Sequence, residues 1–254
     1  YVEEKTGISW QDIRKAALLY KNSKSGLILW TMGVNQSVMG TMTVNAICNL
    51  ALLTGHIGKI GSAPFSLTGQ CNAMGSRALG STASYPGFRK LDDSKDMDEI
   101  ASLWGCSAEE LPKKRTPAKK IFEEIRNGKI KALWIVGTNP MVSFPDTYQT
   151  KKALENLEFL VVQDAYHPTE TSVFADLVLP AAMWGEKTGT MINSERRVNI
   201  ARKAVEPPGE AKSDFEIFLM FAKHMGYNNL FNSWQKQEDA FEEIRLVTKG
   251  RICD

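Results

Sequence analysis

The chain has 254 residues, with 31 Lys and Arg against 29 Asp and Glu, which gives a formal net charge of +2. At about 150 residues per domain, this length predicts one large domain or two modest ones. The near balance of charge argues against a nucleic-acid binder or a polybasic membrane module, because the affinity of both grows with clustered positive charge. No apolar run in the sequence approaches the roughly 20 residues that a membrane-spanning helix needs.

The first part of the chain alternates between helix and strand patterns. Residues 9–22 are predicted to form a helix that Ser9 caps. The short apolar run 26–30 follows, as expected for a buried parallel strand that opens into a polar loop at its carboxyl end. A second helix is predicted at about 42–54 and ends at Gly55. This order is typical of a doubly wound sheet.

Between residues 58 and 87, apolar residues do not recur at helix or strand spacing, and Gly, Ser, Ala, Pro and Asn dominate. Loops of this length are uncommon unless they are functional or disordered. Polar residues such as Gln70 and Arg77 stand among small ones, so we predict a loop that lines a ligand. Helical patterns then follow near 97–104 and 117–127.

The second half carries a clear alternation of strands and helices. Apolar strands are predicted at 132–136, 159–162 and 176–179. Strands that alternate with helical segments indicate a parallel sheet. The helices that complete this pattern are predicted at 147–156, 213–225 and 237–248.

Polar side chains follow the predicted strands, at the edge where ligands bind in open α/β sheets. Asn139 and Gln163 can each donate and accept hydrogen bonds on a purine edge. Ionised Asp164 and Asp214 only accept, which suits a guanine N–H pair or sugar hydroxyls. Lys187 offers a point charge for a phosphate or a pterin carbonyl. Each residue also has a structural explanation, since Asn139 can shape a turn and Lys187 can pair with a surface acid.

Several common site motifs are absent from the sequence. No strand is followed by G-x-G-x-x-G, and there is neither a Walker loop nor a G-x-S-x-G elbow. The three histidines are scattered, so we predict no metal ligand among the residues of this chain. The cysteines lack the spacing of a zinc or iron–sulfur site, and they are Cys48, Cys71, Cys106 and Cys253.

Long motifs in register resemble one known family. Segments 132–140, 161–171 and 175–197 resemble the molybdopterin oxidoreductases, the family of dimethyl-sulfoxide reductase, formate dehydrogenase and the bacterial nitrate reductases. Within the family, the chain is most similar to the catalytic subunits of assimilatory nitrate reductases. The remaining matching segments are 30–36, 68–77 and 209–214.

The resemblance implies an α/β fold with Rossmann-like, doubly wound and mostly parallel sheets. It implies that the chain holds parts of the two middle domains of such an enzyme. Residues 1–75 would be the end of the first Rossmann-like domain. Residues 76–254 would be the second cofactor-binding domain with its C-terminal helices. The chain would then be an internal fragment, inactive by itself, and a [4Fe–4S] cluster would belong to a missing N-terminal part.

The family's cofactor is a molybdenum atom held by two molybdopterin guanine dinucleotides. By resemblance, Met32, Gly33 and Gln36 would line one dinucleotide at a strand end. Gln70 and Arg77 would be catalytic residues nearest the metal, with Arg77 as a candidate anchor for nitrate, because a guanidinium fork matches two oxygens of a planar oxyanion. The other implied cofactor-binding residues are Thr138, Asn139, Gln163, Asp164, Thr169, Lys187 and Asp214.

The implied activity is reduction of nitrate to nitrite by oxygen-atom transfer in nitrate assimilation. Ferredoxin, flavodoxin or an NADH-linked subunit would donate electrons, with no nucleic-acid or membrane partner and a cytoplasmic location. Cys71 stands where relatives often have proline, and Ala78-Leu79-Gly80 replaces an expected Glu-Val-Gly. Three alternatives therefore stay open: a formate dehydrogenase, a free-standing nucleotide-binding module, and a non-catalytic scaffold subunit.

Overall fold

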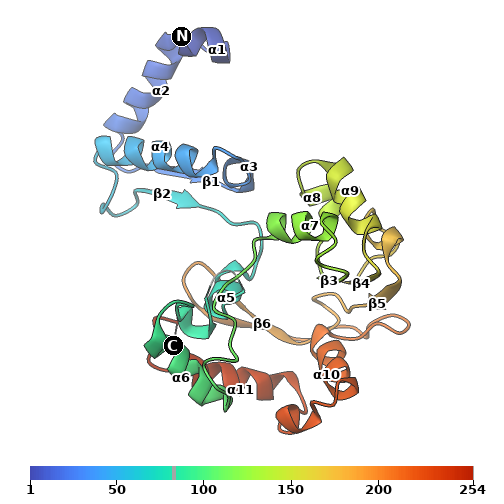
Figure 1. Cartoon of the computed structure of the whole chain (residues 1–254). Helices are drawn as coiled ribbons and strands as arrows, with labels where there is room; N and C mark the ends of the chain where they lie inside the picture. The colour runs from blue at the N-terminus through green and yellow to red at the C-terminus, as the bar shows by residue number, and fades with distance from the viewer. Residues whose placement is uncertain (82–83, 254) are drawn as a thin grey trace. The chain divides into compact units, whose positions relative to one another are not determined.

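The chain divides into two compact units, Tyr1–Cys71 and Asn72–Asp254, which we call unit 1 and unit 2 (Figure 1). The structure is a computed structural model that describes residues 1–81 and 84–253. Unit 1 pairs two strands in parallel, and unit 2 contains a three-stranded parallel sheet and a two-stranded hairpin. The α/β class predicted from the sequence is therefore confirmed.

Unit 1 follows the predicted order of helix, strand and helix. The Ser9 hydroxyl accepts a hydrogen bond from the backbone N–H of Asp12 at 3.1 Å, so the predicted cap forms. Strand β1 pairs in parallel with β2, Leu27 opposite Ala63. The elements of unit 1 are α1 (Val2–Thr6), α2 (Trp10–Asn22), β1 (Leu27–Trp30), α3 (Met32–Asn35), α4 (Gly40–Leu53) and β2 (Ala63–Ser66).

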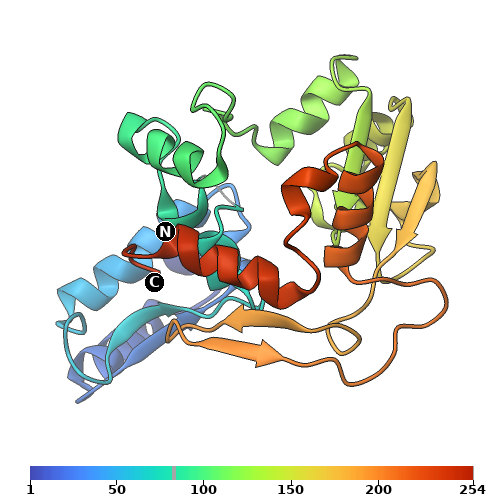
Figure 2. The same cartoon turned by 90° about the horizontal axis from the view of Figure 1, so that it is seen from below.

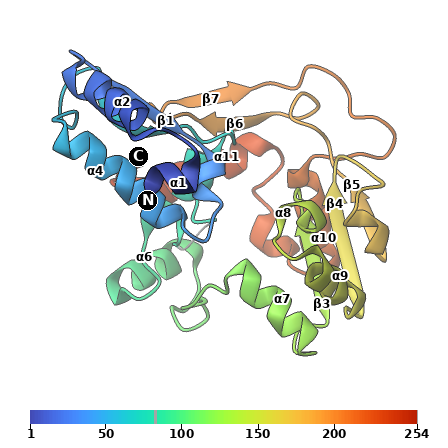
Figure 3. The same ribbon diagram turned by 90° about the horizontal axis from the view of Figure 1, so that it is seen from above.

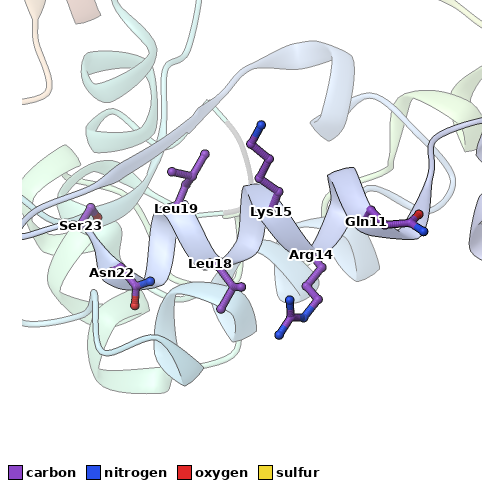
Figure 4. Close-up of a pocket in the computed structure, with 7 residues that line it drawn as sticks. All are labelled: Gln11, Arg14, Lys15, Leu18, Leu19, Asn22 and Ser23. Atoms are coloured by element: carbon purple, nitrogen blue, oxygen red, sulfur yellow. The ribbon is translucent and has the colours of Figure 1, made fainter.

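Helix α2 forms where it is predicted, but none of its residues is buried. Figure 4 shows Lys15 and Leu19 extending from one side of the helix and Arg14 and Leu18 from the other. These side chains diverge, so the shallow hollow that they border on α2 has no convergent polar groups.

The segment predicted as one loop, residues 58–87, contains regular elements among its described residues, and residues 82 and 83 lie outside the part that the structure describes. It contains strand β2 and the short helix α5 (Ala73–Ala78). Four residues that include Pro64 have no strand pattern of their own, and they become a strand because β1 lies beside them. Helix α5 is built from small residues without an apolar period, which is why the sequence did not reveal it.

Unit 2 is organised around the parallel sheet β3-β4-β5. Residue pairs in register are Ile135 with Val162 and Gln163 with Leu179. The elements are α5, η1 (Pro86–Phe88), α6 (Ser94–Trp104), α7 (Ala118–Arg126), β3 (Ala132–Val136), α8 (Pro140–Ser143), α9 (Thr147–Glu155), β4 (Phe159–Asp164), η2 (Ser172–Phe174), β5 (Leu177–Pro180), β6 (Gly189–Ile192), β7 (Val198–Ala201), α10 (Asp214–His224), η3 (Asn228–Phe231) and α11 (Gln237–Thr248).

Side-chain alternation along β3 and β4 decides which helix covers which face of this sheet. Ile135, Leu160 and Val162 point to the face where α7 and α9 pack, and they form the main core with residues of these helices. Trp134 points to the opposite face, where its ring meets that of Phe218 on α10 at 5.1 Å between centroids. Figure 2 shows α10 on one side of the three strands.

An antiparallel hairpin, β6–β7, completes the sheets of unit 2 (Figure 3). The sequence pattern predicted no strand after β5, and this prediction was wrong. Thr190 pairs with Ile200 across the hairpin, and both line a cavity of about 380 Å³ together with Phe241 of α11. The hairpin is stabilised by α11, which lies more than 30 residues further along the chain.

A second core in unit 2 surrounds a buried arginine. The Arg89 side chain is 1% exposed and donates to the backbone carbonyls of Pro86 and Val247, both at 2.6 Å. It also donates to Glu99 at 2.8 Å. This set of bonds ties α6 and α11 to the loop after α5. In the ranges 1–81 and 84–253, no helix is long and apolar enough to cross a membrane.

Candidate functional site

The carboxyl ends of β3 and β4 bring several of the predicted polar residues to one edge of the sheet in unit 2. Strand β3 ends at Val136, and the next residue, Gly137, has a φ of 59°, in the left-handed region that favours glycine. A bend at Gly137 therefore separates β3 from Asn139. The backbone N–H of Gly137 donates to the carbonyl oxygen of Gln163 at 2.9 Å, which holds the two strand ends together.

Gln163 is fully buried and lies on the face of the sheet that α10 covers. Its position follows from the alternation of β4, because Leu160 and Val162 occupy the opposite face. The Gln163 amide nitrogen, Nε2, donates to Oδ1 of Asp214 at 2.7 Å. The amide oxygen, Oε1, has no hydrogen-bond partner among the described residues.

Asp214 is the first residue of α10 and joins Gln163 to Lys187. Its second oxygen, Oδ2, accepts from the Lys187 ammonium group, in an ion pair whose side chains are 29% and 36% exposed. The helix start is fixed by a capping box between Ser213 and Glu216. The hydroxyl and the backbone N–H of Ser213 hold the pKa of Glu216 below its ordinary value, so this carboxylate stays ionised.

The three residues Gln163, Lys187 and Asp214 thus form one connected network. Lys187, Lys212 and Ser213 also line a polar cavity of about 470 Å³ beside the start of α10. Lys203 and Lys236 contribute to the same lining, as do carboxylates that include Glu216. The cavity therefore offers charged groups of both signs next to the network.

Asn139 forms a separate cluster with Glu170 and Thr171, two residues that were not among the predicted site residues. Its amide nitrogen donates to Oε2 of Glu170 at 2.7 Å. Its amide oxygen accepts from the hydroxyl of Thr171 at 2.6 Å. Thr171 is fully buried, and only the folded chain brings it within reach of Asn139, 32 residues away.

The two remaining residues near β4 make local hydrogen bonds. Asp164 accepts from the backbone N–H of Tyr166 at 3.1 Å. The Thr169 hydroxyl accepts from the backbone N–H of Ser172 at 3.0 Å, while the Ser172 hydroxyl accepts from the N–H of Thr169 at 2.7 Å. These bonds shape the loop after β4. Thr138 is exposed in the turn between Gly137 and Asn139.

The predicted residues of unit 1 lie after β1 and after β2. Met32 is the first residue of α3 and is half-buried, whereas Gly33 and Gln36 are exposed. Gln70 is exposed in the loop after β2. Arg77 belongs to unit 2, in the last turn of α5, where its side chain is also exposed.

A pterin or guanine ring fits the donor set of unit 2. Both rings carry ring N–H and amino groups beside a carbonyl oxygen, so they can donate and accept at adjacent atoms. A buried amide oxygen without a partner, as in Gln163, costs free energy until a donor satisfies it. A ligand N–H would supply that donor. No group of three or more His, Cys, Asp or Glu side chains suited to hold a metal ion occurs within the described part of the chain.

A parallel sheet with polar groups at its carboxyl edge has the architecture of open α/β proteins, in which ligands bind at that edge. The molybdopterin oxidoreductase family model matches residues 17–224. The chain belongs to the molybdopterin oxidoreductase family.

Relatives with known names support this assignment along the whole chain. A nitrate reductase of Synechocystis sp. is 46% identical over 98% of the chain, and an F420-dependent formate dehydrogenase subunit alpha of Methanocaldococcus jannaschii is 42% identical over 98%. The assimilatory nitrate reductase catalytic subunit of Bacillus subtilis is 38% identical over 100%. The chain spans 35–36% of the length of these three relatives.

Among solved structures, acetylene hydratase from Pelobacter acetylenicus has the same fold. It superimposes with a TM-score of 0.67 at 20% identity, covering 99% of this chain and 37% of that protein. At this identity the likeness concerns the fold alone. It confirms that both units have the architecture of the family.

Proposed function

We propose that this chain forms part of the cofactor-binding core of an enzyme that carries a molybdenum-bis(molybdopterin guanine dinucleotide) cofactor and reduces nitrate to nitrite. The observation that carries the proposal is the Gln163–Asp214–Lys187 network with its open, buried acceptor on Gln163. Native proteins leave few buried polar atoms without a partner, and a ligand N–H would satisfy the open oxygen of Gln163.

In this proposal each residue has a role that its chemistry permits. Gln163 accepts from a ring N–H of pterin or guanine, and Asp214 holds the Gln163 amide while its ion pair with Lys187 neutralises its charge. Asn139 and Asp164 contribute further hydrogen bonds. The bound cofactor supplies the redox chemistry, and the protein supplies position and electrostatics. The residues proposed to complete the cofactor shell are Met32, Gly33, Gln36, Thr138 and Thr169.

The proposed substrate is nitrate, on the strength of relatives named as nitrate reductases at 46% and 38% identity. Arg77 is the proposed nitrate anchor, with Gln70 beside the metal, because the guanidinium fork matches two oxygens of this anion. The proposal includes a cytoplasmic enzyme that receives electrons from ferredoxin, flavodoxin or an NADH-linked subunit. It also includes a [4Fe–4S] cluster in a further part of the polypeptide.

The domain assignment is part of the same proposal. Residues 1–75 would come from the first Rossmann-like middle domain and residues 76–254 from the second. The structure divides the chain between Cys71 and Asn72.

A formate dehydrogenase is the second candidate. The relative at 42% identity carries that name, and Ala78-Leu79-Gly80 departs from the Glu-Val-Gly expected of a nitrate reductase. The two candidates share the cofactor core and differ in the small anion that is turned over.

An assay of a longer polypeptide that contains this chain separates the candidates. We expect nitrate reduction with reduced methyl viologen and no formate oxidation with an artificial acceptor. Arg77→Lys should raise KM for nitrate more than it lowers kcat, because a point charge replaces a fork. Formate oxidation without nitrate reduction would establish the second candidate.

The 254-residue chain by itself should show no nitrate reduction, since it spans about a third of the relatives' length. Calorimetry with guanosine diphosphate tests the alternative of a free-standing nucleotide-binding module. We expect no binding by this chain alone. Micromolar binding would favour the module over an enzyme fragment.

A further inference from the structure

Two amide side chains, Asn139 and Gln163, lie at the strand ends. Neighbouring residues bind the oxygen and one N–H of Asn139, whereas they bind only the nitrogen of Gln163. An amide can turn either its oxygen or its NH2 group toward a ligand, and the two choices select different ligand atoms. The surroundings of each amide decide which group stays available.

At Asn139, the carboxylate of Glu170 and the hydroxyl of Thr171 determine the orientation of the amide. An ionised carboxylate can accept hydrogen bonds but cannot donate them. The Asn139 atom that faces Glu170 at 2.7 Å must therefore be the amide nitrogen. The pKa of Glu170 lies below its ordinary value because of its backbone N–H and of the Asn139 amide, so the carboxylate is ionised at neutral pH.

Thr171 fixes the other end of the same amide. Its hydroxyl oxygen accepts from the backbone N–H of Met141 at 3.1 Å, and this donor cannot be reversed. The hydroxyl proton is therefore available for the amide oxygen of Asn139 at 2.6 Å. Thr171 is fully buried, so its hydroxyl group is kept from solvent. With its oxygen engaged inward, Asn139 has one N–H left to offer.

At Gln163, Asp214 engages the amide nitrogen and leaves the amide oxygen available. The ionised carboxylate of Asp214 must face the Gln163 nitrogen, at 2.7 Å, and its other oxygen is held by Lys187. The Gln163 oxygen is left buried and without a partner. Gln163 therefore has an acceptor to offer.

We propose that Thr171 and Asp214 are positioning residues that set the hydrogen-bond polarity of the two amides, so that Asn139 presents an N–H donor and Gln163 a carbonyl acceptor. A ligand atom that binds Asn139 must then be an acceptor, such as a carbonyl, ring nitrogen or phosphate oxygen, and one that binds Gln163 must be an N–H donor. A 2-amino-4-oxopyrimidine ring, common to pterin and guanine, carries both kinds of atom. The identity of the bound group rests on the proposed function, whereas the polarity does not.

Side-chain amide spectra of the full 254-residue chain, labelled with ¹⁵N on Asn and Gln, test the polarity directly. One N–H proton of Asn139 should resonate downfield because it binds a carboxylate, and Glu170→Gln should remove that shift. Thr171→Val should change both Asn139 proton signals, whereas Thr171→Ser should keep them. Asn193, whose amide oxygen accepts from its own loop, is the internal control and should not change.

The corresponding variant at the second amide is Asp214→Asn, which should remove a downfield shift from a Gln163 N–H proton. If neither Glu170→Gln nor Thr171→Val changes the Asn139 side-chain signals, the assignment for Asn139 is overturned. A Gln163 signal that ignores Asp214→Asn would overturn it for Gln163.

Cofactor loading then tests the consequence for binding. A longer polypeptide that contains this chain is purified, and its pterin is released and measured by fluorescence. Thr171→Val should lower the pterin content about fivefold, the effect of losing one neutral hydrogen bond, and Thr171→Ser should restore it. Equal pterin in wild type and Thr171→Val would show that Thr171 does not position a binding group. If even the wild type contains no pterin, the proposed function fails while the amide spectra still decide the polarity.

Discussion

Units 1 and 2 both contain helices and parallel strands, but the apolar side chains of their strands differ in exposure to solvent. In unit 2, Leu160 and Val162 of β4 are each 1% exposed, because helices cover both faces of the sheet. In unit 1, Leu27 and Leu29 of β1 are 55% and 53% exposed. An apolar strand becomes a core strand only when further layers cover it, so the sequence pattern alone does not produce burial.

The polar interior of the two units differs as well. Unit 1 buries one large polar side chain, His56, whereas unit 2 buries Arg89, Gln163 and Thr171 among others. Across long stretches of sequence, Arg89 donates to the Val247 carbonyl, Gln163 to Asp214 and Thr171 to Asn139. We therefore expect substitutions of buried residues in unit 2 to lower the free energy of unfolding more than matched substitutions in unit 1.

The largest effect should come from Arg89→Ala. It leaves the carbonyls of Pro86 and Val247 and the carboxylate of Glu99 without their shared donor. Leaving a buried acceptor without its donor costs about 1–3 kcal/mol, and urea unfolding measures the combined loss. The matched control is Lys151→Gln, an exposed partner of Glu155, which should leave the unfolding midpoint unchanged. Equal midpoints for wild type and Arg89→Ala would refute a structural role for this network.

Truncation of matched leucines compares the two sheets directly. Leu160→Ala in β4 should lower the free energy of unfolding by about 2–5 kcal/mol, because it empties part of a packed core. Leu29→Ala in β1 should change it by about 0.5 kcal/mol or less, since the side chain already contacts solvent. The comparison between the units fails if the two truncations cost the same.

His56→Ala tests the one large buried polar side chain of unit 1. The Tyr20 carbonyl only accepts, so Nε2 of His56 donates to it at 2.8 Å, and Nδ1 then accepts from Ser62 at 3.2 Å. Loss of this bridge should cost about 1–3 kcal/mol. Hydrogen exchange should accelerate in α2 and leave β4 protected. His224→Ala, at an exposed position, is the control. Unchanged exchange in α2 would mean that His56 does not hold the helix.

The smallest expected effect is a pH dependence of unit 2. A hydrogen bond from the Lys90 backbone lowers the pKa of Asp96, and one from Arg89 lowers that of Glu99, with Arg251 bound to both acids. Depressed folded-state pKa values stabilise the fold above the ordinary carboxyl range, near pH 4, and this stability is lost as pH falls through the folded values.

Because Glu99 is 41% exposed, solvent screens its pairs, and we expect a loss on the order of 1 kcal/mol. Urea midpoints at pH 6 and pH 3 measure it. Glu99→Gln should reduce the difference between the two midpoints. A variant that keeps the full wild-type difference would exclude Glu99 as the titrating group.

Much of the fold could be predicted because local chemistry fixes it. Ser9 caps α2 where its hydroxyl meets the first free N–H groups, and the apolar runs of β3, β4 and β5 form strands within one or two residues of the expected limits. Strand β2, helix α5 and the hairpin β6–β7 could not be predicted, because their residues have no period and gain order only from neighbours distant in sequence.

The sequence by itself determined the class of fold, the edge of the sheet at which polar residues gather, and the family to which the motifs point. These properties depend on residue type and on spacing along the chain. Only the tertiary structure decided that Thr171 holds Asn139, 32 residues away, and that Asp214 holds Gln163, 51 residues away. Hydrogen-bond polarity depends on which groups meet at about 3 Å, and that meeting is a property of packing, not of spacing.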